Sequence, residues 1–285
     1  FFFTQTTQYA ILSGLVGSEM CIRDRYGTLK YDVKDGIATI CLNRAESANA
    51  MNPLMAKELN QVSLDVSQDE SVRSVVLTST GRMFCAGGDL SEFASAKKGA
   101  GRLMMEMAAD LHLGLSRLSR NRAPVIASVN GTAAGAGFSL VMACDLVIAS
   151  EGSVFTMAYT NAGLSPDGSS TYFMPRRIGD RRARELMLTN RVLSADEALD
   201  WGIVNKVVDK DDLSCETMKL AEKISRGPSL AYEKVKSLLD SSFNQSLETQ
   251  MELETRAISE MVMTEDGQEG ISAFLEKRKP SFKGR

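Results

Sequence analysis

Two short stretches rich in glycine and alanine carry the strongest chemical signal in this chain. They cover residues 84–90 (FCAGGDL) and 130–138 (NGTAAGAGF), and each follows an apolar run typical of a buried strand and leads into a helical pattern. A strand that breaks into small residues and restarts as a helix exposes free backbone N–H groups, which a ligand oxygen can approach closely. If the two turns face each other, their N–H groups can bind a single oxygen atom.

A third stretch, residues 163–168 (GLSPDG), adds a titratable group. Asp167 is the only acid in the apolar and small-residue run 154–175. As a bare motif this stretch is a turn signature, in which the aspartate bonds its own backbone, and each glycine-rich stretch alone is equally compatible with an ordinary tight turn. Neither glycine-rich stretch matches the patterns G-x-G-x-x-G or G-K-[ST] that bind phosphate groups. The chemistry therefore depends on the fold bringing the three stretches together.

Composition bounds the class of protein. With 285 residues, 44% hydrophobic and 24% charged, the chain is typical of a soluble globular protein, which we expect in the cytoplasm. The net charge of −3 gives no basic footprint, so neither nucleic acid nor a membrane is an expected partner.

Cysteine and histidine usage narrows the chemistry further. The five cysteines form no C-x-x-C pair, which argues against a disulfide framework or a zinc site and favours a reducing compartment. His112 is the only histidine and lies in a helical pattern, so a Ser-His-Asp triad or a histidine-based metal site is not expected. We predict no metal, and we expect His112 to be a solvated or hydrogen-bonded helix residue.

Residues 1–25 do not match the rest of the chain. They begin with three phenylalanines, and their apolar run 9–16 is too short to span a bilayer. The amino-acid sequence of this segment resembles translated sequencing-adapter read-through. We therefore expect residues 1–25 to be a non-native or disordered segment that packs poorly.

The rest of the chain alternates strand and helix patterns. A hairpin is predicted over 29–33 and 37–42, a helix from Asn52-Pro53 to about Val66, and a capping box at Ser194 and Glu197. The remaining predicted elements are buried strands at 72–78, 124–129 and 145–149, a long helix at 102–120 and a last strand at 203–208. The alternation predicts an α/β domain with parallel connections over residues 26–208. About four amphipathic helices follow in 209–285, a region that we expect to dock on a neighbouring subunit.

The motifs together resemble the crotonase family, also called the enoyl-CoA hydratase/isomerase superfamily. Besides the three stretches, the resemblance is carried by residues 42–44 (LNR), 49–52 (NAMN), 185–208 and 271–280, and it covers nearly the whole chain after Tyr26. It implies a crotonase-like spiral of ββα units that binds an acyl-CoA thioester, with an α-helical C-terminal region that forms homotrimers, often paired into hexamers. Coenzyme A is then part of the substrate, and no separate cofactor is expected.

The resemblance also assigns roles to individual positions. It implies that the backbone N–H groups of Gly88 and Ala136 form an oxyanion hole, and that Phe274 and Lys277 reach the nucleotide end of CoA from a neighbouring subunit. Without the family match these last two are as well explained as a packing phenylalanine and a solvated lysine. Arg44 is a further candidate for contact with phosphate. The other implied substrate or CoA contacts are Ser47, Ala48, Ala50, Ala86, Gly87, Asp89, Leu90, Tyr159 and Leu164.

The reaction depends on which acids stand beside the oxyanion hole. The positions at which the family's hydratases carry two glutamates match Ser139 and Tyr159, whereas Asp167 falls where Δ3,Δ2-enoyl-CoA isomerases and the ring-opening isomerase of phenylacetate degradation carry a lone catalytic acid. One carboxylate suffices to move a proton from C2 to C4 of a 3-enoyl thioester. We expect apolar neighbours of Asp167, namely Phe138, Leu164 and Phe173, to desolvate it partly.

Three alternatives to the isomerase stay open. The first is an enoyl-CoA hydratase. The second is a hydrolase similar to 4-chlorobenzoyl-CoA dehalogenase, in which a nucleophilic aspartate takes the position of Asp167 and a tryptophan that of Tyr159. The third is a non-catalytic relative that binds acyl-CoA or RNA. The length or aromaticity of the acyl group is left open as well, because the variable stretch 92–107 forms the pocket wall.

Overall fold

The computed structural model describes residues 25–285. Of the segment 1–25, only Arg25 falls in this range, where its guanidinium forms an exposed ion pair with Asp65 (2.9 Å). The expectation for the other residues of that segment lies outside the described residues and stays a prediction.

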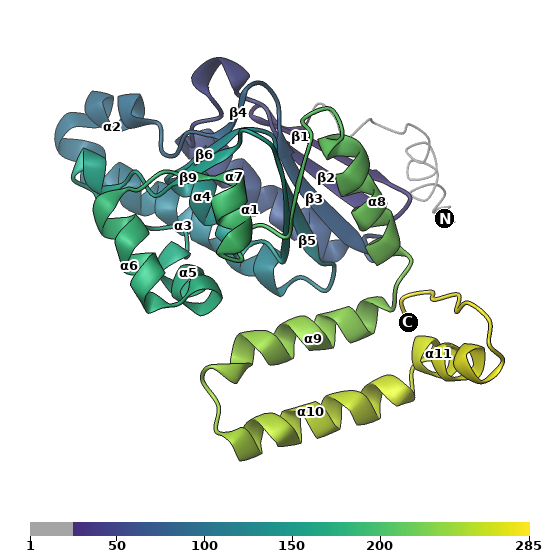
Figure 1. Ribbon diagram of the computed structural model, residues 1–285. Helices are drawn as coiled ribbons and strands as arrows, with labels where there is room; N and C mark the ends of the chain where they lie inside the picture. The colour runs from purple at the N-terminus through teal and green to yellow at the C-terminus, as the bar shows by residue number, and fades with distance from the viewer. Residues whose placement is uncertain (1–24) are drawn as a thin grey trace, which may run out of the picture.

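The centre of the fold is a six-stranded sheet in the order β1-β2-β3-β5-β7-β10 (Figure 1). β1 (Leu29–Lys34) and β2 (Ile37–Leu42) form the predicted antiparallel hairpin. The other strands, β3 (Ser74–Ser79), β5 (Val125–Val129), β7 (Leu146–Ser150) and β10 (Lys206–Val208), continue the sheet in parallel, which confirms the expected connections. β10 is shorter than the predicted 203–208, because the amides of Ile203 and Val204 donate to the carbonyl of Ala198 at the end of a helix instead of to a strand.

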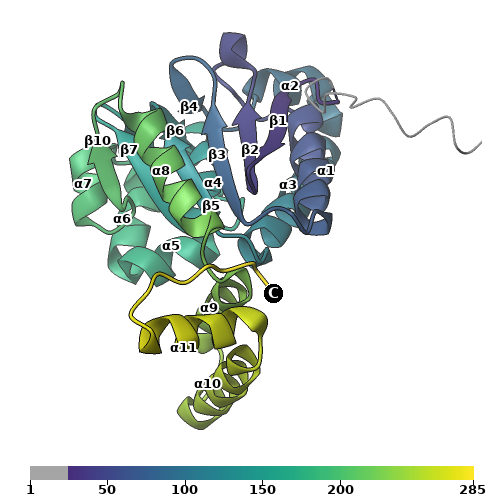
Figure 2. The same ribbon diagram turned by 90° about the vertical axis from the view of Figure 1, so that its right-hand side faces the viewer.

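A second, four-stranded sheet was not predicted. It consists of β4 (Met83–Cys85), β6 (Thr132–Ala134), β8 (Val154–Thr156) and β9 (Leu193–Ser194), of which the first three are parallel. The strands predicted at 72–78 and 124–129 do not lead directly into the glycine-rich turns as expected, because β4 and β6 intervene. Figure 2 shows β4 and β6 beside the main sheet.

Helices cover both faces of the main sheet. α1 (Pro53–Gln68) begins as predicted, with the Asn52 side chain accepting a hydrogen bond from the Met55 amide, and α3 (Ala100–Arg120) packs against it. Strand β3 shows the division of the core, since Val75 and Leu77 pack in the cluster under these helices while Val76 packs with Ile224 of α8 (Leu213–Ser225) on the opposite face.

The remaining helices connect the strands or extend the chain. α2 (Leu90–Ala96), α4 (Ala136–Ala143), α5 (Ser170–Ile178), α6 (Asp180–Thr189) and α7 (Ala195–Asp200) belong to the α/β body, and α7 begins with the predicted capping box of Ser194 and Glu197. Three C-terminal helices, α9 (Ser229–Ser242), α10 (Leu247–Val262) and α11 (Glu265–Leu275), lie together on one side of the sheets (Figures 1 and 2). With α8 they make up the four helices expected after Asp211.

The contact between α1 and α3 generates a stability prediction. A Cβ atom at Gly114 of α3 would lie 3.0 Å from the Leu59 carbonyl oxygen and 3.1 Å from the Asn60 nitrogen, both in the backbone of α1, so we expect Gly114→Ala to lower the free energy of unfolding by about 1–3 kcal/mol. A Cβ atom at Gly101 of the same helix would meet no atom within 4 Å, and Gly101→Ala serves as the control, with a gain of up to about 1 kcal/mol. Urea denaturation of both variants measures the difference. A Gly114→Ala variant as stable as the Gly101→Ala variant would contradict the close packing of the two helices.

Candidate active site

The two glycine-rich turns lie side by side at the ends of β4 and β6. These strands are parallel, with Cys85 opposite Ala133, so their carboxyl ends meet at one edge of the small sheet. Gly87 (φ +104°) and Gly135 (φ +51°) adopt backbone conformations that side chains disfavour. A Cβ atom at Gly135 would lie 3.3 Å from the Cα of Gly87, and the reverse substitution would bring a Cβ within 3.5 Å of Gly135. Glycine at both positions therefore permits the close approach of the two turns.

The amides of Gly88 and Ala136 follow these two glycines. Neighbouring amides are occupied, since Asp89 donates to the Met51 carbonyl (2.8 Å) and Gly135 to the Thr156 carbonyl (3.0 Å). Within residues 25–285 the N–H groups of Gly88 and Ala136 donate to no acceptor, and Ala136 is the first residue of α4, where the helix dipole is positive. Both residues line one cavity of about 260 Å³. The two amides can therefore stabilise negative charge on an oxygen bound in this cavity.

The wall of this cavity is mostly apolar. Among the described residues its lining contains a single carboxylate, that of Asp167, so the fold brings Asp167 to the same cavity as Gly88 and Ala136. The Asp167 side chain is 27% exposed, so it is partly desolvated. Of the three apolar neighbours expected to cause this, Leu164 lines the cavity, whereas Phe138 is fully buried against Phe155 and Phe173 lines a different cavity. Neither phenylalanine lines the cavity with Asp167, and for these two the expected desolvation stays a prediction.

Tyr159 and Ser139 hold the Asp167 segment. The Tyr159 hydroxyl donates to Oδ1 of Asp167 (2.6 Å) and lies 3.1 Å from the Ser139 hydroxyl, which in turn donates to the Asp167 carbonyl (3.0 Å). Burial and the adjacent Asp167 carboxylate raise the pKa of Tyr159, so the phenol stays protonated and remains a hydrogen-bond donor. One oxygen of the carboxylate is therefore fixed by Tyr159.

His112 is a site residue that the sequence reasoning missed. As expected it is a hydrogen-bonded helix residue, since its Nε2 accepts from the Gly168 amide (3.2 Å), but the same nitrogen also lies 3.7 Å from Oδ2 of Asp167. The one sequence feature that could have pointed to His112 is its position on α3, because it directly follows Leu111, which lines the cavity. The separation between positions 112 and 167 gave no indication of the contact.

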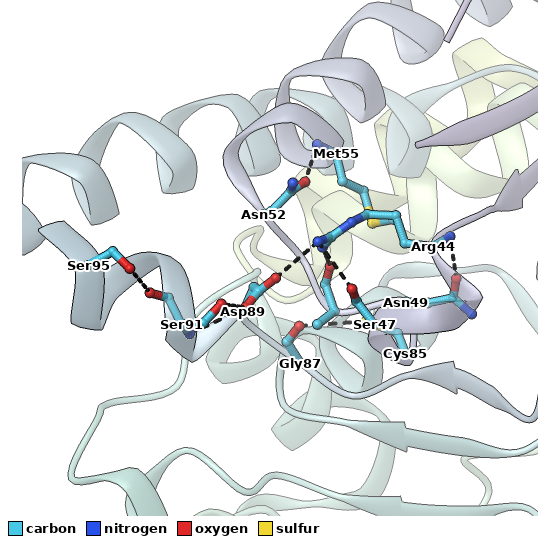
Figure 3. A network of polar contacts seen from close by, with 11 residues as sticks. Arg44, Ser47, Asn49, Asn52, Met55, Cys85, Gly87, Asp89, Ser91 and Ser95 are labelled. Carbon is cyan, nitrogen blue, oxygen red and sulfur yellow. Dashed lines mark hydrogen bonds and ion pairs between the residues drawn. The ribbon is translucent and has the colours of Figure 1, made fainter. Parts of the chain in front are cut away.

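The segment predicted to bind CoA is joined to the first glycine-rich turn by Arg44 (Figure 3). Its guanidinium donates to the Ala50 carbonyl, to the Ser47 hydroxyl (3.4 Å) and to Oδ2 of Asp89 (3.1 Å). Hydrogen bonds from Ser91 and Arg44 lower the pKa of Asp89, so the pair is charged. Because its guanidinium is engaged within the protein, Arg44 acts here as a connector of two loops, and the structure does not favour the suggested phosphate contact.

Backbone hydrogen bonds complete this junction. The Ala86 amide donates to the Ala48 carbonyl (3.0 Å) and the Met51 amide to the Gly87 carbonyl (2.7 Å). The side chain of Asn49 accepts from the Arg44 amide and donates to the carbonyls of Thr80 and Met83. These bonds fix the loop 47–50 against the first glycine-rich turn.

The predicted site residues divide into three groups. Those that line the cavity are Ala86, Gly87, Gly88, Leu90, Ala136, Tyr159, Leu164 and Asp167. Ser47, Ala48, Ala50 and Asp89 lie next to it in the junction described above. Phe274 (82% exposed) and Lys277 lie in and just after α11, and neither lines the cavity. Their proposed contact with the nucleotide stays a prediction that requires a second copy of the chain.

Residues 25–285 contain no cluster of three or more histidine, cysteine, aspartate or glutamate side chains placed to hold a metal ion. In the same range no helix has the length and apolar character needed to cross a membrane.

Comparison with known proteins agrees with this geometry. A family model described as enoyl-CoA hydratase/isomerase matches residues 32–285. The chain is 37% identical to the 1,2-epoxyphenylacetyl-CoA isomerase of Escherichia coli K12 over 254 residues, which cover 89% of this chain and 97% of that protein. It is 33% identical to 4-chlorobenzoyl coenzyme A dehalogenase-2 of an Arthrobacter species, over 85% of this chain and 88% of that protein.

The solved structures agree as well. An enoyl-CoA hydratase from Polaromonas sp. JS666 superposes with a TM-score of 0.86 at 32% identity, covering 90% of this chain and all of that chain. The glycine-rich turns, the cavity and the match over nearly the whole folded chain lead to one conclusion: the chain belongs to the enoyl-CoA hydratase/isomerase family and has the crotonase fold.

Proposed function

We propose that this enzyme is a Δ3,Δ2-enoyl-CoA isomerase. The observation that carries the proposal is that Asp167 supplies the single carboxylate among the described residues that line the cavity of Gly88 and Ala136. The family acts on acyl-CoA thioesters, and a lone acid beside an oxyanion hole suits a proton shift, in which no water is consumed.

The proposed mechanism uses the two amides and one carboxylate. The thioester oxygen binds to the N–H groups of Gly88 and Ala136, and Asp167 removes a proton from C2 of the 3-enoyl group. The electrons of that C–H bond form a dienolate, whose oxygen the amides stabilise, each contributing about 3 kcal/mol in the transition state. The protonated Asp167 then returns the proton to C4, which gives the conjugated 2-enoyl thioester and restores the carboxylate.

Hydration fits this cavity less well. Adding water across a double bond needs one group to activate the water and another to protonate the neighbouring carbon. At the two positions where the resemblance implies glutamates in the family's hydratases, this chain has Ser139 and Tyr159, whose hydroxyls bind the Asp167 segment. Relatives that are each 37% identical to this chain are named a probable enoyl-CoA hydratase and an isomerase, so the preference for isomerisation depends on these side chains and not on the relatives' names.

We also infer that the helices of 209–285 assemble the protein into a homotrimer or a hexamer of two trimers. Large apolar side chains on α9 to α11 are exposed in the single chain, among them Phe243 (66%), Leu247 (71%), Ile258 (70%) and Phe274 (82%). Exposed apolar area of this extent is typical of surfaces that bind another chain. A neighbouring copy would then supply Phe274 and Lys277 to the nucleotide end of CoA.

Replacing Asp167 tests the acid. We expect Asp167→Asn to lower turnover of a 3-enoyl-CoA at least 100-fold, because the amide cannot take up the C2 proton whereas it can still accept the Tyr159 hydrogen bond. The appearance of the conjugated 2-enoyl thioester in the ultraviolet measures turnover, and product mass distinguishes isomerisation from hydration. CoA binding and oligomer size should not change, and Asp200→Asn on the exposed end of α7 is the matched control. Near wild-type turnover by Asp167→Asn would refute the assignment.

Removing one hydroxyl tests the orientation of the carboxylate. We expect Tyr159→Phe to lower kcat about tenfold or more with little change in KM, because a hydrogen bond to a charged group contributes about 1.5–3 kcal/mol and here it fixes Oδ1 of Asp167. Tyr232→Phe on α9, distant from the cavity, controls for the loss of a phenol. A Tyr159→Phe enzyme with unchanged kcat would show that the hydrogen bond does not position the acid.

A second candidate function is favoured by His112. In this reaction the carboxylate would displace a leaving group from an aryl-CoA and form an ester. The Nε2 of His112, 3.7 Å from Oδ2 of Asp167, could then release the Gly168 amide and take a proton from the water molecule that hydrolyses the ester. The relative named 4-chlorobenzoyl coenzyme A dehalogenase-2, 33% identical, is consistent with this chemistry. Chloride release from 4-chlorobenzoyl-CoA, measured with an ion-selective electrode, would support hydrolytic dehalogenation, and its absence beside active isomerisation would exclude it.

A further inference from the structure

One face of α3 lines two cavities in succession. Met104, Met107, Ala108 and Leu111 line the cavity that contains Asp167, which we call the catalytic cavity. His112, Leu115, Ser116 and Ser119 continue this face by one and two turns and line a second cavity of about 510 Å³ between α3, α5 and α9. The spacing of three and four residues places all of them on a continuous strip of the helix.

The segment 167–169 contributes to both cavities, with Asp167 lining the catalytic cavity and Ser169 the second cavity. We call this segment and the adjacent His112 ring the partition. Within the segment Gly168 has φ +60°, and a Cβ atom there would lie 2.8 Å from the Cβ of Ser139. The His112 ring closes the partition by accepting the Gly168 amide, and its side chain is 49% exposed, so it has room to move.

The order of groups in the catalytic cavity sets the direction of a bound acyl chain. The amides of Gly88 and Ala136 would bind the C1 oxygen, and Asp167 would reach C2 to C4. A chain that continues past Asp167 along α3 meets the residues of the second cavity next on the strip. The catalytic cavity of about 260 Å³ lies at the low end of the volumes of ligand pockets, so a long chain needs further room.

We propose that the second cavity binds the distal part of the acyl group, so that the enzyme prefers medium-chain and long-chain 3-enoyl thioesters to short ones. This inference rests on the proposed function. The lining of this cavity combines the apolar side chains of Leu115 and Phe173 and the ring of Tyr172 with hydroxyl and charged groups, including those of Ser119, Arg120 and Asp240.

A plug in the second cavity tests the proposal. Each buried methylene of the acyl chain is worth about a fourfold gain in affinity, so the wild-type enzyme should have a kcat/KM at least about tenfold higher for 3-dodecenoyl-CoA than for 3-hexenoyl-CoA. Ser116→Trp, which fills the cavity from α3, should abolish this preference and leave turnover of 3-hexenoyl-CoA within about twofold of the wild type. Leu113→Trp on the same helix, half exposed and lining neither cavity, is the matched control and should keep the preference.

A second variant and a binding measurement keep the test independent of folding and of turnover. Ser237→Trp enters the same cavity from α9 and should reproduce the effect of Ser116→Trp. Calorimetry with dodecanoyl-CoA and hexanoyl-CoA, which cannot react by isomerisation, should give tighter binding of the longer ester to the wild type and equal binding to both plugged variants.

The outcomes separate the two proposals. Equal binding of both saturated esters to the wild type, or an unchanged chain-length preference in both plugged variants, would overturn the second cavity as the acyl subsite. If the wild type converts neither 3-enoyl ester but binds dodecanoyl-CoA more tightly, and the plugged variants lose this gain, the isomerase proposal fails and the subsite stands.

Discussion

The close contact between the backbones of Gly87 and Gly135 is the constraint on which the rest of the site depends. The gap between the two turns holds no Cβ atom, so any side chain at either position would push them apart. Their approach is enforced from outside, by the parallel pairing of β4 with β6 and by the bonds of Arg44 and the 47–50 loop to the first turn. Two amide groups thereby open into one cavity without any contribution from side-chain chemistry, and the fold supplies them at fixed positions before a substrate binds.

The carboxylate is held by a different kind of interaction. Asp167 lies on an irregular segment between the second sheet and α5, where no ladder of backbone bonds fixes it. Its position instead depends on the hydroxyls of Tyr159 and Ser139 and on the imidazole of His112, which come from three separate elements. Because burial keeps Tyr159 protonated, it donates to the carboxylate throughout the neutral pH range. A rigid backbone site thus faces an acid whose orientation is set by side chains.

The sequence predicted those turns and helix caps that depend only on interactions between neighbouring residues. The hairpin at Asp35-Gly36, the cap of α1 by Asn52 and the capping box at Ser194 each depend on a few neighbouring residues, and the structure confirms all three. The three-residue strands β4, β6 and β8 were missed, because so short an element has no measurable period and owes its conformation to its partners. The proximity of His112 to Asp167 and the cavity beyond it were also missed, because both arise from segments that are far apart in the sequence and meet only in the folded chain. The resemblance to the family singled out Gly88, Ala136 and Asp167, which line one cavity, whereas composition and spacing alone left them as turns.

The division between backbone and side-chain contributions explains how one scaffold can serve several reactions. Substitution changes the side chain of a residue but leaves its amide, so the N–H groups of Gly88 and Ala136 survive most sequence change as long as the glycines beside them keep the turns together. In the proposed mechanism the side chains that select the reaction lie on α4, on the loop after β8 and on the segment before α5, at Ser139, Tyr159 and Asp167. These three positions are joined by hydrogen bonds, so a change at one alters the demands on the other two. A glutamate at Ser139 or Tyr159 would put a second negative charge beside Asp167 and would remove a hydrogen-bond donor from the Asp167 segment. A single acid held by neutral hydroxyls is therefore a self-consistent alternative to a pair of acids.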